Sequence, residues 1–415
     1  MTYEETLHYL YTSIPVFQHS GASAYKPGLG TSIALDDYLG NPHKAYKTIH
    51  VAGTNGKGSV SHLLAAILRQ SGFKVGLYTS PHLVDFRERI RVNGKKISQD
   101  YVVDFVERHR SFFEPLHPSF FELTSSMAFE YFRDQQVDYA VIEVGLGGRL
   151  DSTNIITPIL SIITNISLDH TQFLGDTEEK IAAEKAGIIK KDCPVVTILQ
   201  KAEAMVAIEA EAEKQHARLY TADVSKVTVE TETLKEIRFD HPGLGTVTTR
   251  LTGTYQVENC CLAVTVLKEI LGIADRIIID GIKNTVWPGR FEVIGEQPLF
   301  IIDGAHNEDA ALQLSASVEK YFTNIPITYI IGVLADKEHK KVLEAMLPYA
   351  GAAFTVTPDN PRAMKAEELA SSQKRSWLVC GKREPESQKK YKAQKIVHRE
   401  QKVWNRFRRS VHAVP

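Results

Sequence analysis

Residues 51–60 read VAGTNGKGSV. A β-branched run at residues 48–51 leads into this stretch, and apolar residues at helical spacing follow it over residues 63–68. This context predicts a strand, a glycine turn and a helix start. Such a turn offers backbone N–H groups and a helix N-terminus to phosphate, and Lys57 can neutralise phosphate charge. The alternative is a tight strand–helix connection that needs glycine only for its backbone angles.

The length and composition of the chain place it among ordinary globular proteins. Its 415 residues favour two domains. The net charge of -1 hides an asymmetry: residues 371–415 carry 13 Lys and Arg against 3 Asp and Glu, whereas the rest carries 36 against 47. Four cysteines without CxxC spacing, an N-terminus without a signal peptide pattern and no apolar run of ~20 residues predict a cytoplasmic protein.

Strand and helix patterns alternate over most of the sequence. Strands are expected at residues 48–51, 74–78, 139–144, 159–164 and 194–198, and helices at 59–71, 99–110, 125–135, 177–188, 202–215 and 256–271. This order predicts an α/β domain of the P-loop type with a mostly parallel sheet. Residues 226–251 predict a small antiparallel sheet. A second, smaller Rossmann-like α/β series begins at residues 299–302, so domains are expected at 1–295 and 296–370, followed by a basic tail at 371–415.

Polar residues stand at the ends of three predicted strands. They are Ser80, Glu143 and the pair Asp169-His170. Because ligands of parallel sheets bind at the carboxyl edge of the strands, these side chains can hold a metal ion opposite the phosphate loop. For Glu143 the alternative is a carboxylate satisfied by the amides of the glycines that follow it.

Three further positions have a structural alternative beside a functional one. Lys185 lies at the end of a predicted helix, where a cation compensates the helix dipole. Asp303 and His306 lie on a strand-to-helix turn, where Asn307 can be the N-cap. Arg290 precedes the predicted domain boundary and is placed to contact a nucleotide.

Together these segments closely resemble the folylpolyglutamate synthase/dihydrofolate synthase family, a branch of the Mur ligase group. The matching motifs include GTNGKGS at residues 53–59, TSPHL at 79–83, EKAGIIK at 184–190, PGR at 288–290 and DGAHN at 303–307. The resemblance extends from about residue 20 to residue 370. It implies an ATP-dependent ligase that phosphorylates a folate carboxylate and lets the amine of L-glutamate attack the acyl phosphate. Dihydropteroate is implied as a possible second acceptor, Mg²⁺ as the metal and a monomer as the assembly.

The resemblance also implies roles for individual residues. ATP would be bound by Gly53, Thr54, Asn55, Gly56, Lys57, Gly58, Ser59, Asn259, Arg290 and Asp303. The pterin-bearing substrate would lie at Ser119, Phe120, Phe121, Glu122, Leu150, Asp151 and Ser152. The metal ligands would be Ser80, Glu143, His170 and Lys185, the last matching a lysine that the family carbamylates. The catalytic residues would be Lys57, Lys185 and His306.

Two segments depart from the family pattern. Residues 30–32 lack the charged residues that usually follow Gly-Leu in the folate loop. After Ala370 the Lys- and Gln-rich sequence replaces the expected end of the glutamate-binding domain, which predicts a disordered tail. A shifted reading frame and a basic arm for RNA or acidic membranes are the two interpretations. The altered end also suggests an alternative function, a nucleotide-binding protein with impaired ligase activity. A Mur peptidoglycan ligase is a further rival, but its GTNGKT[TS] motif differs from GTNGKGS.

Overall fold

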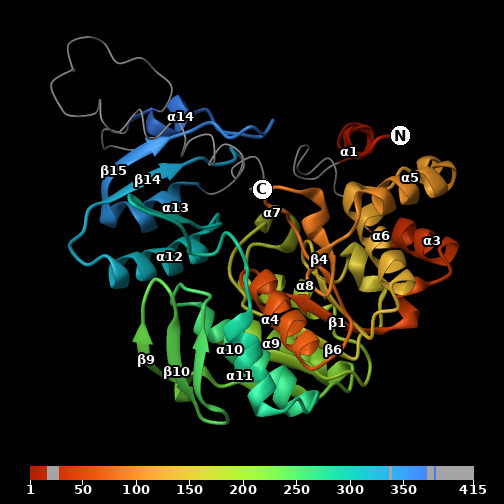
Figure 1. Cartoon of the computed structure of the whole chain (residues 1–415), viewed down its shortest axis with the longest axis horizontal. Helices are drawn as coiled ribbons and strands as arrows, with labels where there is room; N and C mark the ends of the chain where they lie inside the picture. Colours follow the sequence, from red (N-terminus) through yellow and green to blue (C-terminus); the bar gives the residue numbers. More distant parts are fainter. Residues whose placement is uncertain (16–27, 336–338, 372–377, 380–415) are drawn as a thin grey trace. The chain divides into compact units, whose positions relative to one another are not determined.

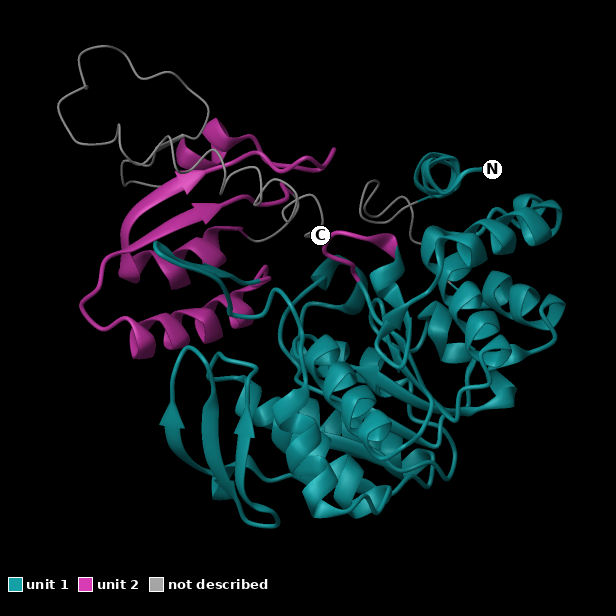
Figure 2. Cartoon of the chain, in the orientation of Figure 1, with its two compact units in different colours: residues 1–80, 87–303 teal, residues 81–86, 304–415 magenta. Residues whose placement is uncertain are grey.

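The computed structural model (Figure 1) describes residues 1–15, 28–335, 339–371 and 378–379. The chain divides into two compact units, residues 1–80 with 87–303 and residues 81–86 with 304–415 (Figure 2). The predicted boundary at 295/296 falls within the hairpin of β12 (Glu292–Glu296) and β13 (Leu299–Ile302). Because these two strands pair with each other, the whole hairpin stays in the first unit. Most of the predicted tail lies outside the described residues.

An eight-stranded sheet forms the centre of the first unit, in the order β4-β3-β2-β5-β1-β6-β7-β8 (Figure 1). The strands are β1 (Lys47–Ala52), β2 (Val75–Tyr78), β3 (Ile90–Val92), β4 (Lys95–Lys96), β5 (Tyr139–Glu143), β6 (Leu160–Ile163), β7 (Val195–Ile198) and β8 (Leu219–Ala222). The neighbouring strands from β2 through β5, β1, β6 and β7 to β8 pair in parallel. Strand β3 pairs antiparallel with both β2 and β4. The predicted mostly parallel sheet is confirmed.

The helices of the first unit include several at the predicted positions. They are α1 (Tyr3–Thr12), α3 (Gly30–Tyr38), α4 (Lys57–Gln70), α5 (Gln99–Phe113), α6 (Phe120–Asp134), α7 (Thr171–Leu174), α8 (Glu178–Ala186), α9 (Ala202–Lys214), α10 (Gln256–Val264) with a π-helical extension (Thr265–Ile270), and α11 (Asp275–Asn284). Helix α6 begins five residues before the predicted start, because Ser119 and Glu122 form a capping box there.

Both faces of the sheet are covered by helices because successive strand residues point to opposite sides. Ile162 and Val196 join one buried cluster with apolar residues of α4, α10 and α11. Their neighbours Ile163 and Val195 join another with residues of α8 and α9. This sandwich fixes the carboxyl ends of β1, β2, β5 and β6 at one edge, where the candidate site lies.

A small antiparallel sheet follows α9, as predicted. It consists of β9 (Thr228–Glu232), β10 (Ile237–His241) and β11 (Gly245–Thr249) in sequence order. Ile237, Phe239 and Val247 bury their side chains in the cluster that contains α10 and α11. The three strands thus extend the core of the first unit.

The second unit has the predicted α/β alternation. Its elements are α12 (Glu308–Tyr321), β14 (Ile327–Ile331), α13 (His339–Met346), β15 (Ala350–Thr355), α14 (Ala366–Ser371) and β16 (Leu378–Val379). The strands pair in parallel in the order β14-β15-β16. Strand β16 therefore continues the sheet beyond residue 371. Within the described residues, no helix is both long and apolar enough to cross a membrane.

Candidate active site

The phosphate loop, residues 53–59, connects β1 to α4 in a conformation that requires glycine. Gly53 has φ +147° and a Cβ atom there would lie 1.8 Å from Thr164 Oγ1. Gly56 has φ +85°, and its Cβ would lie 2.5 Å from Asn259 Oδ1. Both positive φ angles disfavour other residues. The glycines therefore let Thr164 and Asn259 approach the loop.

The turn after β6 holds the phosphate loop in place. Thr54 N donates to Asn165 O at 2.7 Å and Asn55 N donates to Asn165 Oδ1 at 2.6 Å. Thr164 Oγ1 in turn donates to Asn55 O at 2.6 Å. These bonds organise the loop in advance, so that its shape does not depend on a ligand. Asn165 was not predicted from the sequence, because its partner Asn55 lies 110 residues away and no motif links the two positions.

Two lysines share one backbone carbonyl of the phosphate loop. Lys57 Nζ donates to Gly53 O at 2.9 Å and to Thr54 O at 3.0 Å, and Lys185 Nζ donates to Gly53 O at 2.8 Å. Burial and the charge of Lys57 lower the pKa of Lys185 to about 7. Burial also lowers the pKa of Lys57. Lys185 lies in the last turn of α8, as predicted, and its side chain contacts a loop 132 residues away in the sequence.

Glu143 is a buried carboxylate near Lys57, whose charge acts on it. It ends β5, is 3% exposed and accepts a hydrogen bond from Ser80 N at 2.9 Å. Burial raises the pKa of Glu143 to about 7, although the charge of Lys57 acts in the opposite direction. The alternative that glycine amides satisfy Glu143 is wrong, because the amides of Gly145 and Leu146 donate to Asp151.

Some of the residues predicted to contact the pterin-bearing substrate lie at the turn after β5, and others lie at the start of α6. Asp151 is buried and accepts from the amides of Gly145, Leu146 and Thr153, which fixes the turn. Phe121 packs on the turn so closely that a Cβ at Gly145 would lie 2.4 Å from its ring. Ser119 and Glu122 bond each other in the α6 capping box. Two of these seven residues, Phe121 and Asp151, thus shape the same turn.

His170 follows β6 with φ +50° and a side chain that is 25% exposed. Its Nε2 lies 3.9 Å from Asp169 Oδ1. The negative charge of Asp169 acts on the pKa values of both Lys57 and Lys185, which places this turn near the two lysines. Among the described residues, no three His, Cys, Asp or Glu side chains cluster closely enough to hold a metal ion.

The predicted nucleotide contacts lie around the start of α4. Asn259 Nδ2 donates to Gln256 Oε1 at 2.9 Å, and Gln256 Nε2 donates to Ser59 Oγ at 3.3 Å. The indole of Trp287 stacks on His62 with ring centroids 3.8 Å apart and contacts the position of Gly58. Sequence reasoning missed Gln256 and Trp287, although both neighbour predicted residues.

The last predicted residues, Asp303 and His306, belong to different units, because the first unit ends at Asp303. Asp303 Oδ2 accepts from Tyr255 Oη at 2.9 Å and from Phe291 N at 2.8 Å. His306 belongs to the second unit, where its Nδ1 lies 2.9 Å from Gly304 O. Asn307 caps α12 by accepting from Ala310 N at 2.9 Å, which confirms the N-cap interpretation.

Comparison with known proteins adds a class to this geometry. The sequence model of the Mur ligase middle domain matches residues 51–267, and that of the Mur ligase glutamate ligase domain matches residues 289–397. The second match continues past the predicted domain end at residue 370. These two matches identify the chain as a Mur-type ligase. The mostly parallel sheet, the phosphate loop with its two lysines and the following α/β unit agree with this class.

Individual relatives narrow the class. The dihydrofolate synthase/folylpolyglutamate synthase of Bacillus subtilis is 36% identical over 372 residues, covering 85% of this chain and 86% of the relative. The crystal structure of folylpolyglutamate synthase from Thermotoga maritima is 38% identical, covers 91% of this chain and 88% of that chain, and has a TM-score of 0.78. The Mycobacterium tuberculosis folylpolyglutamate synthase complexed with ADP and AMPPCP is 32% identical, covers 83% of each chain and has a TM-score of 0.77. The chain belongs to the folylpolyglutamate synthase/dihydrofolate synthase family.

Proposed function

We propose that the protein is an ATP-dependent ligase that joins L-glutamate to a folate. ATP phosphorylates the folate carboxylate, and the amine of glutamate displaces phosphate from the acyl phosphate. The observation that carries the proposal is the buried group of Glu143, Lys57 and Lys185 at the phosphate loop, in which all three pKa values are shifted by burial. Family membership gives the substrate class, since the relatives are named for folate and its glutamates.

Phosphoryl transfer needs positioned positive charge more than covalent protein chemistry. The amides of the phosphate loop and the Nζ of Lys57 are the groups that would hold the ATP phosphates. Hydrogen bonds from the turn after β6 fix the loop, which reduces the cost of ordering it around a nucleotide. Asn259 of α10 and Arg290, whose charge acts on Lys57, would extend this surface.

The residues at the strand ends fit Mg²⁺. Ser80 and Glu143 supply the oxygen atoms that this ion prefers, and they are adjacent through the bond from Ser80 N to Glu143 Oε2. A divalent cation would also supply the positive charge that buried Glu143 lacks, as its raised pKa indicates. Ser80, Glu143 and His170 would hold the ion, which would neutralise charge on the transferring phosphate.

Lys185 is suited to carbamylation. The reaction joins the neutral amine nitrogen to the carbon of CO₂ with loss of a proton, so it needs an unprotonated amine. A pKa of about 7 leaves a large fraction of Lys185 unprotonated near neutral pH, unlike an ordinary lysine. The carbamate would convert a buried cation into an oxygen ligand at the phosphate loop. His306 would act on the incoming glutamate.

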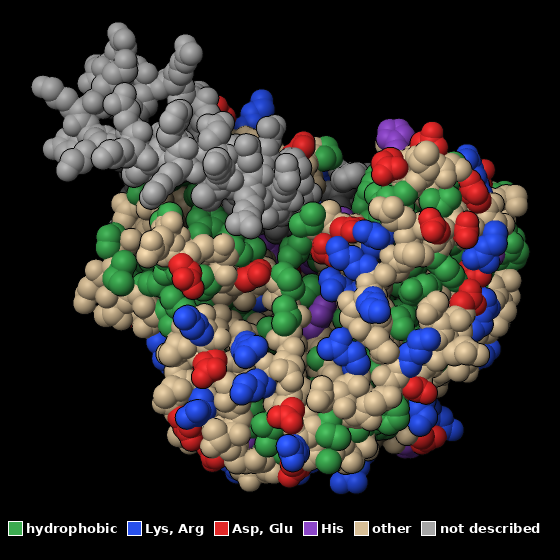
Figure 3. All heavy atoms as spheres, viewed as in Figure 1, with side chains coloured by type: hydrophobic (Ala, Val, Ile, Leu, Met, Phe, Trp, Pro, Cys, Tyr) green, Lys and Arg blue, Asp and Glu red, His purple; other side chains and the backbone are tan. Residues whose placement is uncertain are grey.

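The competing functions have weaker support. The contacts at the phosphate loop do not separate a ligase from a nucleotide-binding protein without ligase activity, but family membership favours the ligase. On the face drawn in Figure 3, Lys and Arg are interspersed with Asp and Glu over the larger unit, which argues against a broad nucleic-acid surface there. The cytoplasmic location and the monomeric state stay predictions.

ADP release tests the proposed function. The purified chain is supplied with Mg²⁺ and ATP, and tetrahydrofolate and dihydropteroate are offered separately, each with and without L-glutamate. Release that needs both acceptor and glutamate supports the ligase, and the active acceptor identifies the substrate. ATP binding without such release would support the alternative, a nucleotide-binding protein with impaired ligase activity.

A further inference from the structure

Phe291, which follows Arg290, has an unusual backbone conformation. Its φ is +47°, in the left-handed region, and its side chain is 1% exposed. A bulky residue seldom occupies this region, because its Cβ approaches the following carbonyl oxygen. Such a conformation persists only where the surroundings enforce it, and it is often found where a neighbouring side chain must be aimed.

Three side chains enforce this conformation, and we call them the Phe291 clamp: Thr252, Tyr255 and Asp303. Thr252 Oγ1 donates to Phe291 O at 2.9 Å, and Phe291 N donates to Asp303 Oδ2 at 2.8 Å. Tyr255 Oη donates to the same Asp303 oxygen at 2.9 Å. Both backbone polar groups of Phe291 are therefore held by side chains from distant parts of the sequence.

Close packing adds to these hydrogen bonds. Gly253 has φ +96°, and a Cβ atom there would lie 2.9 Å from the Tyr255 ring and 3.3 Å from Phe291 Cβ. Any other residue would push the loop of Thr252 away from Phe291. The absence of a side chain at Gly253 therefore allows the loop of Thr252 to pack against Phe291.

The direction of the preceding residue follows from the clamp. The guanidinium carbon of Arg290 lies 5.9 Å from the centroid of the Trp287 ring, which itself packs on the Gly58 position. Its charge is near enough to act on Lys57 and Glu143. The Arg290 guanidinium therefore lies near the phosphate loop, and the clamp holds the backbone of the residue that directly follows it.

We propose that Thr252 and Tyr255 are positioning residues that act through Arg290 to set the affinity for the phosphates of a nucleotide. This inference rests on the proposed ATP site and names residues for it beyond the phosphate loop. Asp303 has a part in it as well, because the carboxylate oxygen that holds Phe291 belongs to a predicted nucleotide contact. The clamp acts on the phosphate end of ATP and leaves the chemistry at the folate carboxylate to other groups.

A double-mutant cycle on the full chain tests the proposal. Binding of AMPPCP with Mg²⁺ is measured by calorimetry for Thr252→Val, Tyr255→Phe and Arg290→Ala, and for the double variants Thr252→Val/Arg290→Ala and Tyr255→Phe/Arg290→Ala. We expect each clamp variant to weaken binding about 3- to 10-fold in the wild-type background and not at all in the Arg290→Ala background. Thr252→Ser keeps the hydroxyl and should retain the wild-type affinity.

Thr285→Val is the matched control. Thr285 is buried and its Oγ1 donates to Gly281 O at 2.8 Å, so it loses the same kind of bond outside the clamp. Its AMPPCP affinity should equal that of the wild type.

Equal losses for the clamp variants with and without Arg290 would overturn the proposal and leave the nucleotide site intact. An unchanged affinity of Arg290→Ala would overturn both the proposal and the assigned role of Arg290, while the ADP assay would still decide the ligase. Tyr255→Phe removes one oxygen atom only and keeps the test valid if Thr252→Val does not fold.

Discussion

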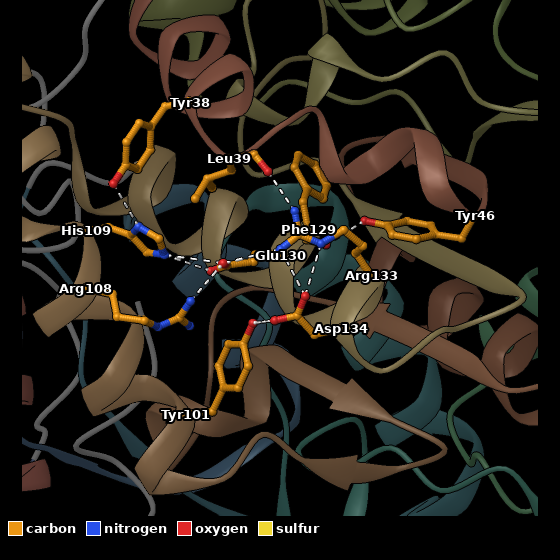
Figure 4. Close-up of polar contacts among 10 residues, drawn as sticks. All are labelled: Tyr38, Leu39, Tyr46, Tyr101, Arg108, His109, Phe129, Glu130, Arg133 and Asp134. Carbon is orange, nitrogen blue, oxygen red and sulfur yellow. Dashed lines mark hydrogen bonds and ion pairs between the residues drawn. The ribbon is translucent and has the colours of Figure 1, made fainter.

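Two buried glutamates of the first unit, Glu130 and Glu143, are equally hidden from solvent and differ in everything around them. Each is 3% exposed. The Glu130 carboxylate lies within 3.4 Å of nitrogen atoms of Arg108, His109 and Arg133 (Figure 4). Glu143 accepts one backbone N–H at 2.9 Å, and burial raises its pKa to about 7. The Glu130 carboxylate links helices α5 and α6 through three charged partners. The less compensated Glu143 carboxylate is the kind of buried group expected at a ligand-binding site.

The surroundings of Glu130 have no counterpart at the phosphate loop. Helices α5 and α6 contribute Arg108, His109, Arg133 and Glu130 itself, and Arg133 Nη1 also donates to Leu39 O at 2.6 Å, beyond α3 (Figure 4). Such a network rigidifies a helix layer when every member is satisfied. The comparison predicts that activity and stability respond to the two glutamates in opposite ways.

The largest expected effect is that of Glu143→Gln on activity. Loss of the carboxylate should lower kcat/KM for ADP release on the order of 1,000-fold, because it removes the charge that would hold Mg²⁺.

The same variant should change stability in the opposite direction. The folded pKa of Glu143 lies above the ordinary value of 4.5, so ionisation costs stability as pH rises from about 4.5 through 7. At pH 8 the variant should therefore be more stable by roughly 1 to 3 kcal/mol. Urea unfolding at pH 5 and pH 8 measures this; a variant less stable than wild type at pH 8 contradicts it.

Lys185 should give the next largest effect. Lys185→Arg keeps a cation that cannot be carbamylated, and should lower kcat/KM about 100-fold or more. Since the wild-type amine is unprotonated above a pKa of about 7, bicarbonate should restore activity to CO₂-depleted enzyme better at pH 8 than at pH 6. The activity of Lys185→Arg should not respond to bicarbonate at either pH. Equal recovery of the wild type at both pH values would count against carbamylation.

The site was predictable from sequence where one motif held all the necessary information, and not where partners lie far apart. The phosphate loop is predictable from its glycines and from the strand and helix patterns on either side of it. Glu143 was found because a strand end predicts an edge position. Lys185 needed the family resemblance, since its carbonyl partner is 132 residues away and its helix-end position has a sufficient local explanation. The left-handed backbone of Phe291 could not be predicted, because Thr252 and Asp303 impose it on a residue type that disfavours it.

The third prediction concerns Glu130→Gln and reverses the pattern of Glu143→Gln. Removing the carboxylate leaves Arg108, His109 and Arg133 close together without their common anion, so the free energy of unfolding should fall by about 2 to 4 kcal/mol. Because none of these residues contacts the phosphate loop, kcat/KM of the folded variant should stay within about twofold of wild type. Urea unfolding and the ADP assay at a temperature below the transition measure the two quantities. A loss of activity matching that of Glu143→Gln would erase the distinction between the two glutamates.

The smallest expected effect is that of Arg108→Ala, which tests how the Glu130 network shares its load. The Arg108 side chain is 48% exposed, so solvent screens its 3.2 Å contact with Glu130, and His109 and Arg133 remain to compensate the carboxylate. The free energy of unfolding should fall by less than about 1 kcal/mol. Arg110→Ala is the matched control, because Arg110 on the same helix pairs with exposed Glu114 at 2.7 Å and should cost a similar amount. Both losses of unfolding free energy should be smaller in about 0.5 M salt, because dissolved ions screen the attraction between exposed charges. If Arg108→Ala cost as much as Glu130→Gln, the carboxylate would depend on a single partner, and Glu130 would resemble Glu143 more closely than the contacts around it indicate.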